Sequence, residues 1–144
     1  MFVVDTNVLV YAADADAPEH EPCRSALEEW RLGRTPWYLT WGIIYEFLRV
    51  VTHPRVLRSP FETVGAMSFV EAVLASPSVH LLTETSRHLE VLAEVVDEVT
   101  LLAGNLYHDA HTAALMRENG LRSIVTRDTD FHRFPFLDVI DPLQ

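Results

Sequence analysis

Short apolar runs of strand length alternate with helical segments along the whole chain, and this alternation restricts the fold more than any other feature. Five runs are predicted to be strands: Phe2–Val4, Trp37–Thr40, Val79–Leu82, Ser123–Thr126 and Leu137–Ile140. Short, continuously apolar strands separated by helices are typical of a parallel sheet that is covered on both faces. The sequence therefore predicts an α/β fold, a three-layer sandwich in which about five short strands are flanked by helices on both sides.

The helices are predicted where apolar residues recur every three or four positions, and glycine, proline or asparagine marks several of their ends. The expected segments are Val8–Ala13, His20–Leu32, Trp41–Val51, Phe61–Ala75, Ser86–Leu102 and Leu106–Glu118. The length of 144 residues matches one domain of about 100–150 residues. We therefore expect residues 1–144 to form a single domain.

The charged residues exclude several classes of function. All eleven cations are arginines, and the absence of lysine rules out Schiff-base chemistry and a P-loop. Against them stand 21 acids, which leave a net charge of −10. This balance argues against a general nucleic-acid-binding protein, because neutralising phosphates requires clustered cations.

The single cysteine, Cys23, excludes an intramolecular disulfide and any zinc site built from several cysteines. No apolar run approaches the roughly 18 residues of a membrane helix, and no basic stretch precedes the apolar N-terminus. The sequence thus predicts a cytoplasmic protein without a membrane association.

Five acids stand out by their positions. Asp5 follows the first predicted strand, and Asp128 and Asp130 follow the fourth. The carboxyl ends of parallel strands lie at one edge of the sheet, where ligands of such folds bind. Glu46 and Asp109 lie on helices that are otherwise strongly apolar.

A divalent cation would explain why so many acids converge. A buried carboxylate is costly unless it is paired or binds a metal, and neighbouring carboxylates raise one another's pKa. Oxygen ligands alone favour Mg²⁺ or Mn²⁺ over zinc. Taken singly, each acid has an ordinary explanation as a helix N-terminal residue, a turn residue or a surface residue. The joint pattern favours the metal site, because all of these explanations would have to hold at once.

Four segments resemble the motifs of PIN-domain nucleases, in order along essentially the whole chain. Val3–Leu9, with the sequence VVDTNVL, resembles the opening of the family, and Glu46 corresponds to its second acid. Leu106–His111 resembles the third acidic motif, and Ile124–Phe131 resembles the fourth. Among these nucleases, a chain of this length is most similar to the VapC ribonuclease toxins of bacterial toxin–antitoxin pairs.

The resemblance implies a PIN-like fold and an endoribonuclease that depends on Mg²⁺ or Mn²⁺. It assigns the catalytic, metal-binding acids as Asp5, Glu46, Asp109 and Asp128, with Asp130 as an auxiliary ligand. It gives a supporting role, through hydrogen bonds, to Thr6, Asn7, Thr126 and Arg127. The implied partners are an RNA substrate, a second copy of the chain and a cognate antitoxin with a basic C-terminal tail. The apolar helices between Trp41 and Ala75 fit such partners, because they offer more apolar surface than one buried stripe needs.

Other functions stay open to different degrees. A phosphatase of the haloacid-dehalogenase type requires a second aspartate two residues after the first and a lysine, whereas Asn7 occupies that position and lysine is absent. A flap-nuclease-like activity on DNA, RNA processing outside a toxin–antitoxin pair, and a non-catalytic PIN binding module are the remaining alternatives. His108 and His111 either form a zinc or two-metal cluster beside Asp109 or pack around the acidic site.

Overall fold

The computed structural model describes all 144 residues and contains one five-stranded, entirely parallel sheet. The strands are β1 (Phe2–Val4), β2 (Trp37–Thr40), β3 (Val79–Leu82), β4 (Ser123–Val125) and β5 (Asp138–Ile140). Their order across the sheet is β3-β2-β1-β4-β5. The predicted parallel α/β architecture with five short strands is confirmed.

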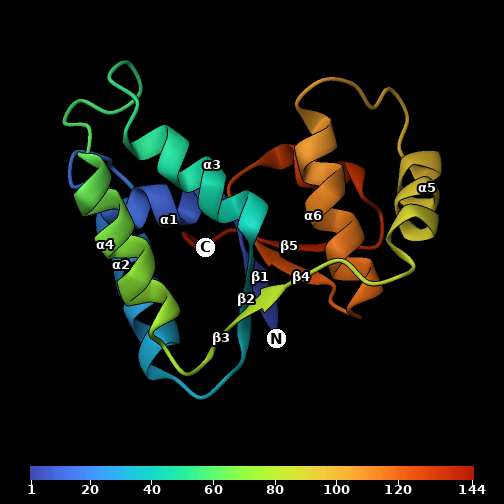
Figure 1. Cartoon of the computed structure of the whole chain (residues 1–144), viewed down its shortest axis with the longest axis horizontal. Helices are drawn as coiled ribbons and strands as arrows, with labels where there is room; N and C mark the ends of the chain where they lie inside the picture. Colours follow the sequence, from blue (N-terminus) through green and yellow to red (C-terminus); the bar gives the residue numbers. More distant parts are fainter.

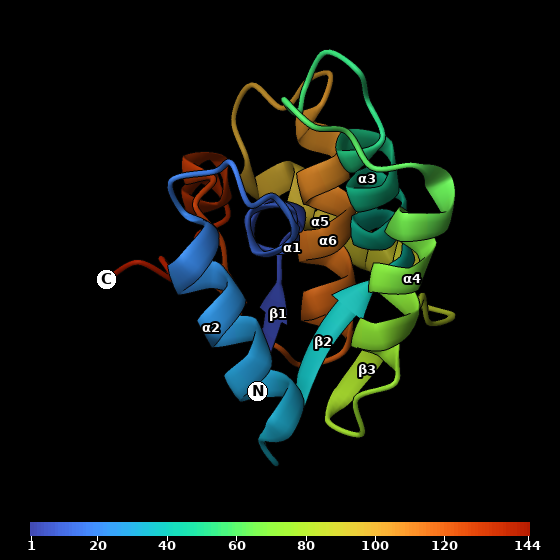
Figure 2. The same cartoon turned by 90° about the vertical axis from the view of Figure 1, so that its left-hand side faces the viewer.

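Helices cover both faces of this sheet (Figures 1 and 2). One side carries α1 (Thr6–Ala13), α2 (His20–Leu32), α3 (Trp41–Val51) and α4 (Thr63–Leu74). The other side carries α5 (His88–Glu98) and α6 (Leu106–Glu118). The arrangement is the expected three-layer sandwich, and none of its helices is long and apolar enough to cross a membrane.

Helix boundaries differ from the predicted ones where side chains or backbone geometry end the regular structure. Helix α1 begins at Thr6 instead of Val8, because the Asp5 carboxylate accepts the Thr6 backbone N–H and caps the helix. Helix α5 ends at Glu98 instead of Leu102, and Leu101 adopts a positive φ of 60° that no helix tolerates. A short 3₁₀ helix at Thr129–Arg133, absent from the prediction, follows β4.

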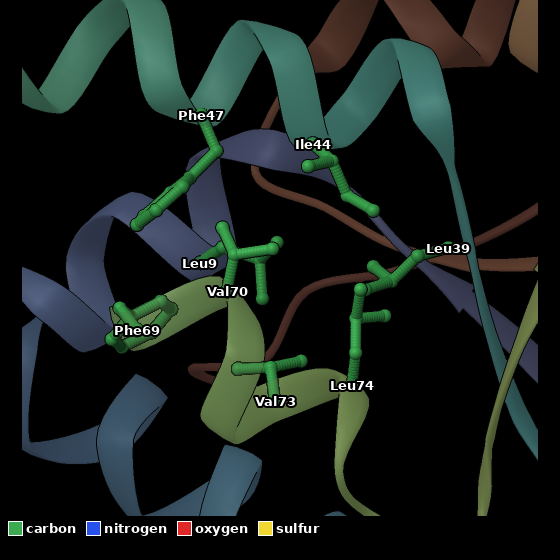
Figure 3. Close-up of a pocket in the computed structure, with 8 residues that line it drawn as sticks. All are labelled: Leu9, Leu39, Ile44, Phe47, Phe69, Val70, Val73 and Leu74. Atoms are coloured by element: carbon green, nitrogen blue, oxygen red, sulfur yellow. The ribbon is translucent and has the colours of Figure 1, made fainter. Parts of the chain in front are cut away.

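The face of the sheet beneath α3 and α4 is closely packed. Phe47 of α3 is fully buried and stacks on Phe69 of α4, with ring centroids 4.9 Å apart. Figure 3 shows these rings with the aliphatic side chains from α1, β2, α3 and α4 that line the same pocket. The void that they enclose is about 10 Å³, barely the space of one water molecule. This apolar pocket is therefore part of the core and not a ligand site.

The order of the strands creates a switch point between β1 and β4. From β1 the chain builds outward through β2 to β3, and it then crosses to the other side of β1 to form β4. The Asp5 backbone N–H donates to the Val125 carbonyl at 3.0 Å, so the ends of β1 and β4 stay joined beyond the strands. Ligands of open α/β sheets bind in the crevice at such a switch point.

Candidate active site

Asp5, the first residue after β1, is buried and held by three hydrogen bonds. Its carboxylate accepts the Thr6 backbone N–H at 2.7 Å, the Asn7 side-chain amide at 2.8 Å and the Thr126 hydroxyl at 2.6 Å. Burial raises the pKa of Asp5, although the three donors act in the opposite direction. The carboxylate is therefore fixed in one orientation at a place where its negative charge is costly without a nearby cation.

Thr126, at the end of β4, connects the two central strands. Its hydroxyl donates to Asp5 and accepts both the Asn7 amide and the Asp128 backbone N–H, each at 2.9 Å. Thr126 is only 1% exposed, so these bonds have no competition from solvent. This one hydroxyl sets the relative position of the residues that follow β1 and β4.

The other predicted supporting residues act in different ways. Arg127 donates its backbone N–H to the Asn7 side-chain oxygen at 3.2 Å. Its guanidinium, however, lies 3.0 Å from a Glu19 carboxylate oxygen and 3.5 Å from one of Asp141. Arg127 therefore supports the site through its backbone, while its side chain is engaged elsewhere. The Thr6 hydroxyl donates to the Ile43 carbonyl at 3.3 Å, which ties α1 to α3.

Three further acids lie close enough together to share one cation. Oxygen atoms of Asp109, Asp128 and Asp130 all lie within 4.8 Å of one another. Asp128 accepts the Asp130 backbone N–H at 2.9 Å, so the 3₁₀ helix after β4 fixes the spacing of these two carboxylates. Asp130, expected to be auxiliary, thus belongs to the closest group of acids, with Asp109 brought to it from the first turn of α6.

The pKa of Asp109 reports the convergence of all five acids. Burial is the main cause that raises it to about 7, and the negative charges of Asp128, Asp5, Asp130 and Glu46 raise it further. A group of carboxylates that repel one another in this way is the donor set that Mg²⁺ or Mn²⁺ prefers, since both bind oxygen ligands. The residues present therefore fit such an ion.

Two of the five acids pair with an arginine: Asp130, whose Oδ1 lies 3.3 Å from Arg133 Nε, and Glu46. The guanidinium of Arg49, one helical turn further along α3, donates to both Glu46 oxygens at 2.5 and 3.0 Å. These hydrogen bonds lower the pKa of Glu46 and keep it ionised. Glu46 is thus an ionised carboxylate whose charge is balanced by Arg49, whereas Asp109 has no cationic partner.

All five acids line one open cleft of about 1220 Å³. The lining of the cleft comes mainly from α1, α3 and α6, with contributions from the loops that follow α3 and α5. Figures 1 and 2 show how these helices and loops are arranged. Arg49 is the only arginine in its lining. The volume exceeds the roughly 300–1,000 Å³ of small-molecule sites, and the open shape suits a polymeric substrate.

The two histidines near Asp109, His108 and His111, have different contacts in the structure. His108 lines the cleft together with Glu46. His111 lines the cleft as well, but its Nε2 lies 2.9 Å from a carboxylate oxygen of Glu84, beyond β3. His88, Glu84 and His111 form a second group of candidate ligands, which sequence reasoning missed because Glu84 and His88 have no spacing that relates them to His111.

Comparison with known proteins gives consistent matches over the whole chain. Residues 2–137 match the family model described as PIN domain. Ribonuclease VapC48 of Mycobacterium tuberculosis is 35% identical over 140 residues, which cover 97% of this chain and 96% of that protein. The crystal structure of VapBC2 from Rickettsia felis, bound to a DNA fragment from its promoter, superimposes with a TM-score of 0.69 at 18% identity, covering 96% of each chain. M. tuberculosis VapC20, described as a sarcin–ricin loop cleaving toxin, gives 0.66 at 17% identity over 92% of this chain and 93% of that one.

Proposed function

Because this chain belongs to the PIN-domain family, we propose that it is a divalent-metal-dependent endoribonuclease and the toxin of a VapBC-type toxin–antitoxin pair. The ribonuclease names of relatives that match nearly its full length support this proposal. The observation that carries it is the convergence of Asp5, Asp109, Asp128 and Asp130 at the switch point of the sheet, inside an open cleft of about 1220 Å³. We further propose that residues 1–144 act as one domain.

The contacts of each acid indicate its role at this site. Asp109, Asp128 and Asp130 would hold Mg²⁺ or Mn²⁺, with Asp5 completing the oxygen ligands beside Asp128. The bound ion would lower the pKa of a water ligand and stabilise the charge that develops on the phosphate. Thr126 and Asn7 hold the Asp5 carboxylate in its orientation, so that it needs no rearrangement when substrate binds.

Glu46 and Arg49 would act on the water and the phosphate from the α3 side of the cleft. Glu46 stays ionised beside Arg49 and can accept a hydrogen bond from the attacking water. Arg49 is 61% exposed in its side chain and can share its guanidinium with a phosphate oxygen. With a single arginine in the cleft, most of the substrate affinity must come from the metal.

The first prediction distinguishes RNA from DNA as substrate. Purified protein with Mg²⁺ or Mn²⁺ should cleave a structured single-stranded RNA internally and leave a DNA of the same sequence intact. Gel electrophoresis of end-labelled strands would show shortened labelled fragments, cut at internal positions, from the RNA alone. Cleavage of the DNA at an equal or higher rate would support the flap-nuclease-like alternative instead, and cleavage of neither strand would support a binding module or a narrower RNA specificity.

The charge of the cleft indicates the chemistry of the antitoxin. Five acids and one arginine line the cleft, and the whole chain carries a net charge of −10. An extended segment rich in arginine or lysine would complement this surface, compete with the metal for the carboxylates and block the cleft to RNA. We therefore propose that the antitoxin covers the cleft with a basic C-terminal tail.

The second prediction concerns a homodimer. Trp41 and Tyr45, one turn apart on α3, are 49% and 70% exposed, whereas Ile44 and Phe47 on the same helix are buried. We expect the exposed rings to be covered by a second copy, so that light scattering after size exclusion gives twice 16.4 kDa at micromolar concentration. Trp41→Glu should shift the protein to the monomer. A wild-type protein that elutes only as a monomer would contradict the proposed dimer.

A further inference from the structure

Two histidines and a glutamate form a compact group separate from that of Asp109, Asp128 and Asp130, although one of the histidines, His111, also lines the cleft. Glu84 lies in the loop after β3, His88 begins α5, and His111 lies on α6. A ligand atom from each residue lies within 4.8 Å of the other two. Three separate segments of the chain thus converge on one point with two nitrogen donors and one oxygen donor.

The donor atoms of these three residues already lie close to the spacing that they would have around one metal ion. His111 Nε2 and Glu84 Oε1 are 2.9 Å apart, and the two imidazole rings meet edge to face with centroids 5.5 Å apart. Donors at bond lengths of about 2.0–2.2 Å around a tetrahedral ion lie a little over 3 Å from one another. Small rotations of partly exposed side chains are enough to reach that spacing.

A buried carboxylate fixes the orientation of His88. His88 Nδ1 lies 3.2 Å from both carboxylate oxygens of Glu118, whose side chain is only 1% exposed. The same carboxylate accepts the Thr85 backbone N–H at 3.2 Å, and thereby holds the loop that carries Glu84. An imidazole that donates its Nδ1–H to a carboxylate presents its Nε2 lone pair outward, which is the usual arrangement of a metal-ligating histidine.

We propose that Glu84, His88 and His111 form a second metal site, selective for Zn²⁺ or a similar borderline transition-metal ion. Two imidazoles and one carboxylate are a donor set of catalytic zinc sites, in which water takes the fourth position. The nitrogen donors select against Mg²⁺, so this site and the carboxylate cluster bind different ions. The bound ion joins the β3–α5 loop and α5 to α6, the helix that also carries Asp109.

Metal-binding titrations test this site independently of ribonuclease activity. Protein freed of metal is titrated with Zn²⁺ against a chromogenic chelator, in millimolar Mg²⁺ to saturate the carboxylate cluster, and Co²⁺ spectra then report tetrahedral coordination. We expect one tight Zn²⁺ per chain in the wild type, in Asp109→Asn and in the control His80→Gln, whose imidazole lies on β3 outside the group. Glu118→Gln should weaken binding by about 10–100-fold, as loss of an outer partner does.

His88→Gln and His111→Gln should weaken Zn²⁺ binding more than Glu118→Gln does, and should abolish the tetrahedral Co²⁺ spectrum. Circular dichroism of each variant establishes that the fold is retained. The proposal is overturned if the wild type binds no Zn²⁺ more tightly than His88→Gln does, or if the tight ion disappears in Asp109→Asn. Either result would leave the three residues as ordinary ion pairs between histidine and glutamate.

Discussion

Asp109→Asn should lose RNA cleavage by at least about 10³-fold in saturating Mg²⁺, while the fold is retained. The substitution removes the charge of an acid whose pKa is raised to about 7 by burial and by four neighbouring carboxylates, and with it a proposed ligand of the ion. Metal stabilisation of the transition state is worth several kcal/mol, and each 1.4 kcal/mol corresponds to a factor of ten in rate. Initial rates on a fluorophore-labelled RNA measure the loss.

The matched control is Asp97→Asn, which removes an exposed acid of α5 outside the cleft. Its rate should stay within about twofold of the wild type, because surface charges away from a site have small effects. Wild-type rates in Asp109→Asn would remove Asp109 from the site, whereas equal losses in both variants would point to a general effect of charge.

The same substitution should change the pH dependence of stability in the metal-free protein. The pKa of Asp109 is about 7 in the folded chain, against an ordinary value of 3.8. Between these values the folded state binds more protons than the unfolded state, so the stability of the wild type falls relative to Asp109→Asn as the pH rises from about 4 to about 7. Above pH 7 the difference becomes constant, and saturating Mg²⁺ should reduce it. Thermal melting across this range measures the effect, and parallel curves for the two proteins would contradict the pKa.

Thr126→Val should have the second largest effect, although it removes no acid. The variant has nearly the same shape but lacks the hydroxyl that donates to Asp5 and accepts from Asn7. Unpaired buried partners cost about 1–3 kcal/mol, and loss of an outer partner lowers metal affinity or activity by about 10–100-fold. We expect a loss in this range, with the Mn²⁺ concentration needed for half-maximal cleavage shifted upward.

Two further variants distinguish a role of the Thr126 hydroxyl in positioning Asp5 from a role in packing. Thr126→Ser keeps the hydroxyl and should recover most of the activity. Thr112→Val removes a hydroxyl from another buried residue that lines the cleft, and it should leave the metal dependence unchanged. If Thr126→Val needs no more Mn²⁺ than the wild type, Thr126 does not position the ligands.

The fold could be predicted well from the sequence because its three central strands, β1, β2 and β4, are largely buried. Apolar runs such as Phe2–Val4 and Trp37–Thr40 can be recognised as strands from their own residues, before their partner strands are known. Both strands occur as predicted. The order of the strands could not be predicted, since it depends on the crossover from β3 to β4. The 3₁₀ helix at Thr129–Arg133 was also missed, although its cap, the Asp128 side chain that accepts the Asp130 backbone N–H, is local.

The candidate site shows a similar division. The five acids could be selected from the sequence because a carboxylate at a strand end or on an apolar helix is conspicuous, and the structure places all five around one cleft. The direction of the Arg127 side chain could not be predicted, since Glu19 and Asp141 reach it from distant segments. For the same reason, the group of Glu84, His88 and His111 left no pattern in the sequence.

The metal dependence of RNA cleavage tests the central proposal most directly. Wild-type protein is freed of metal with EDTA, and the rate on labelled RNA is then measured as Mg²⁺ or Mn²⁺ is added. We predict no cleavage above background without the ion. The cleavage rate should then rise and saturate as the ion binds to the carboxylates of Asp109, Asp128 and Asp130. Cleavage at the full rate in excess EDTA would contradict the account, because the converging acids would then have no catalytic cation to hold.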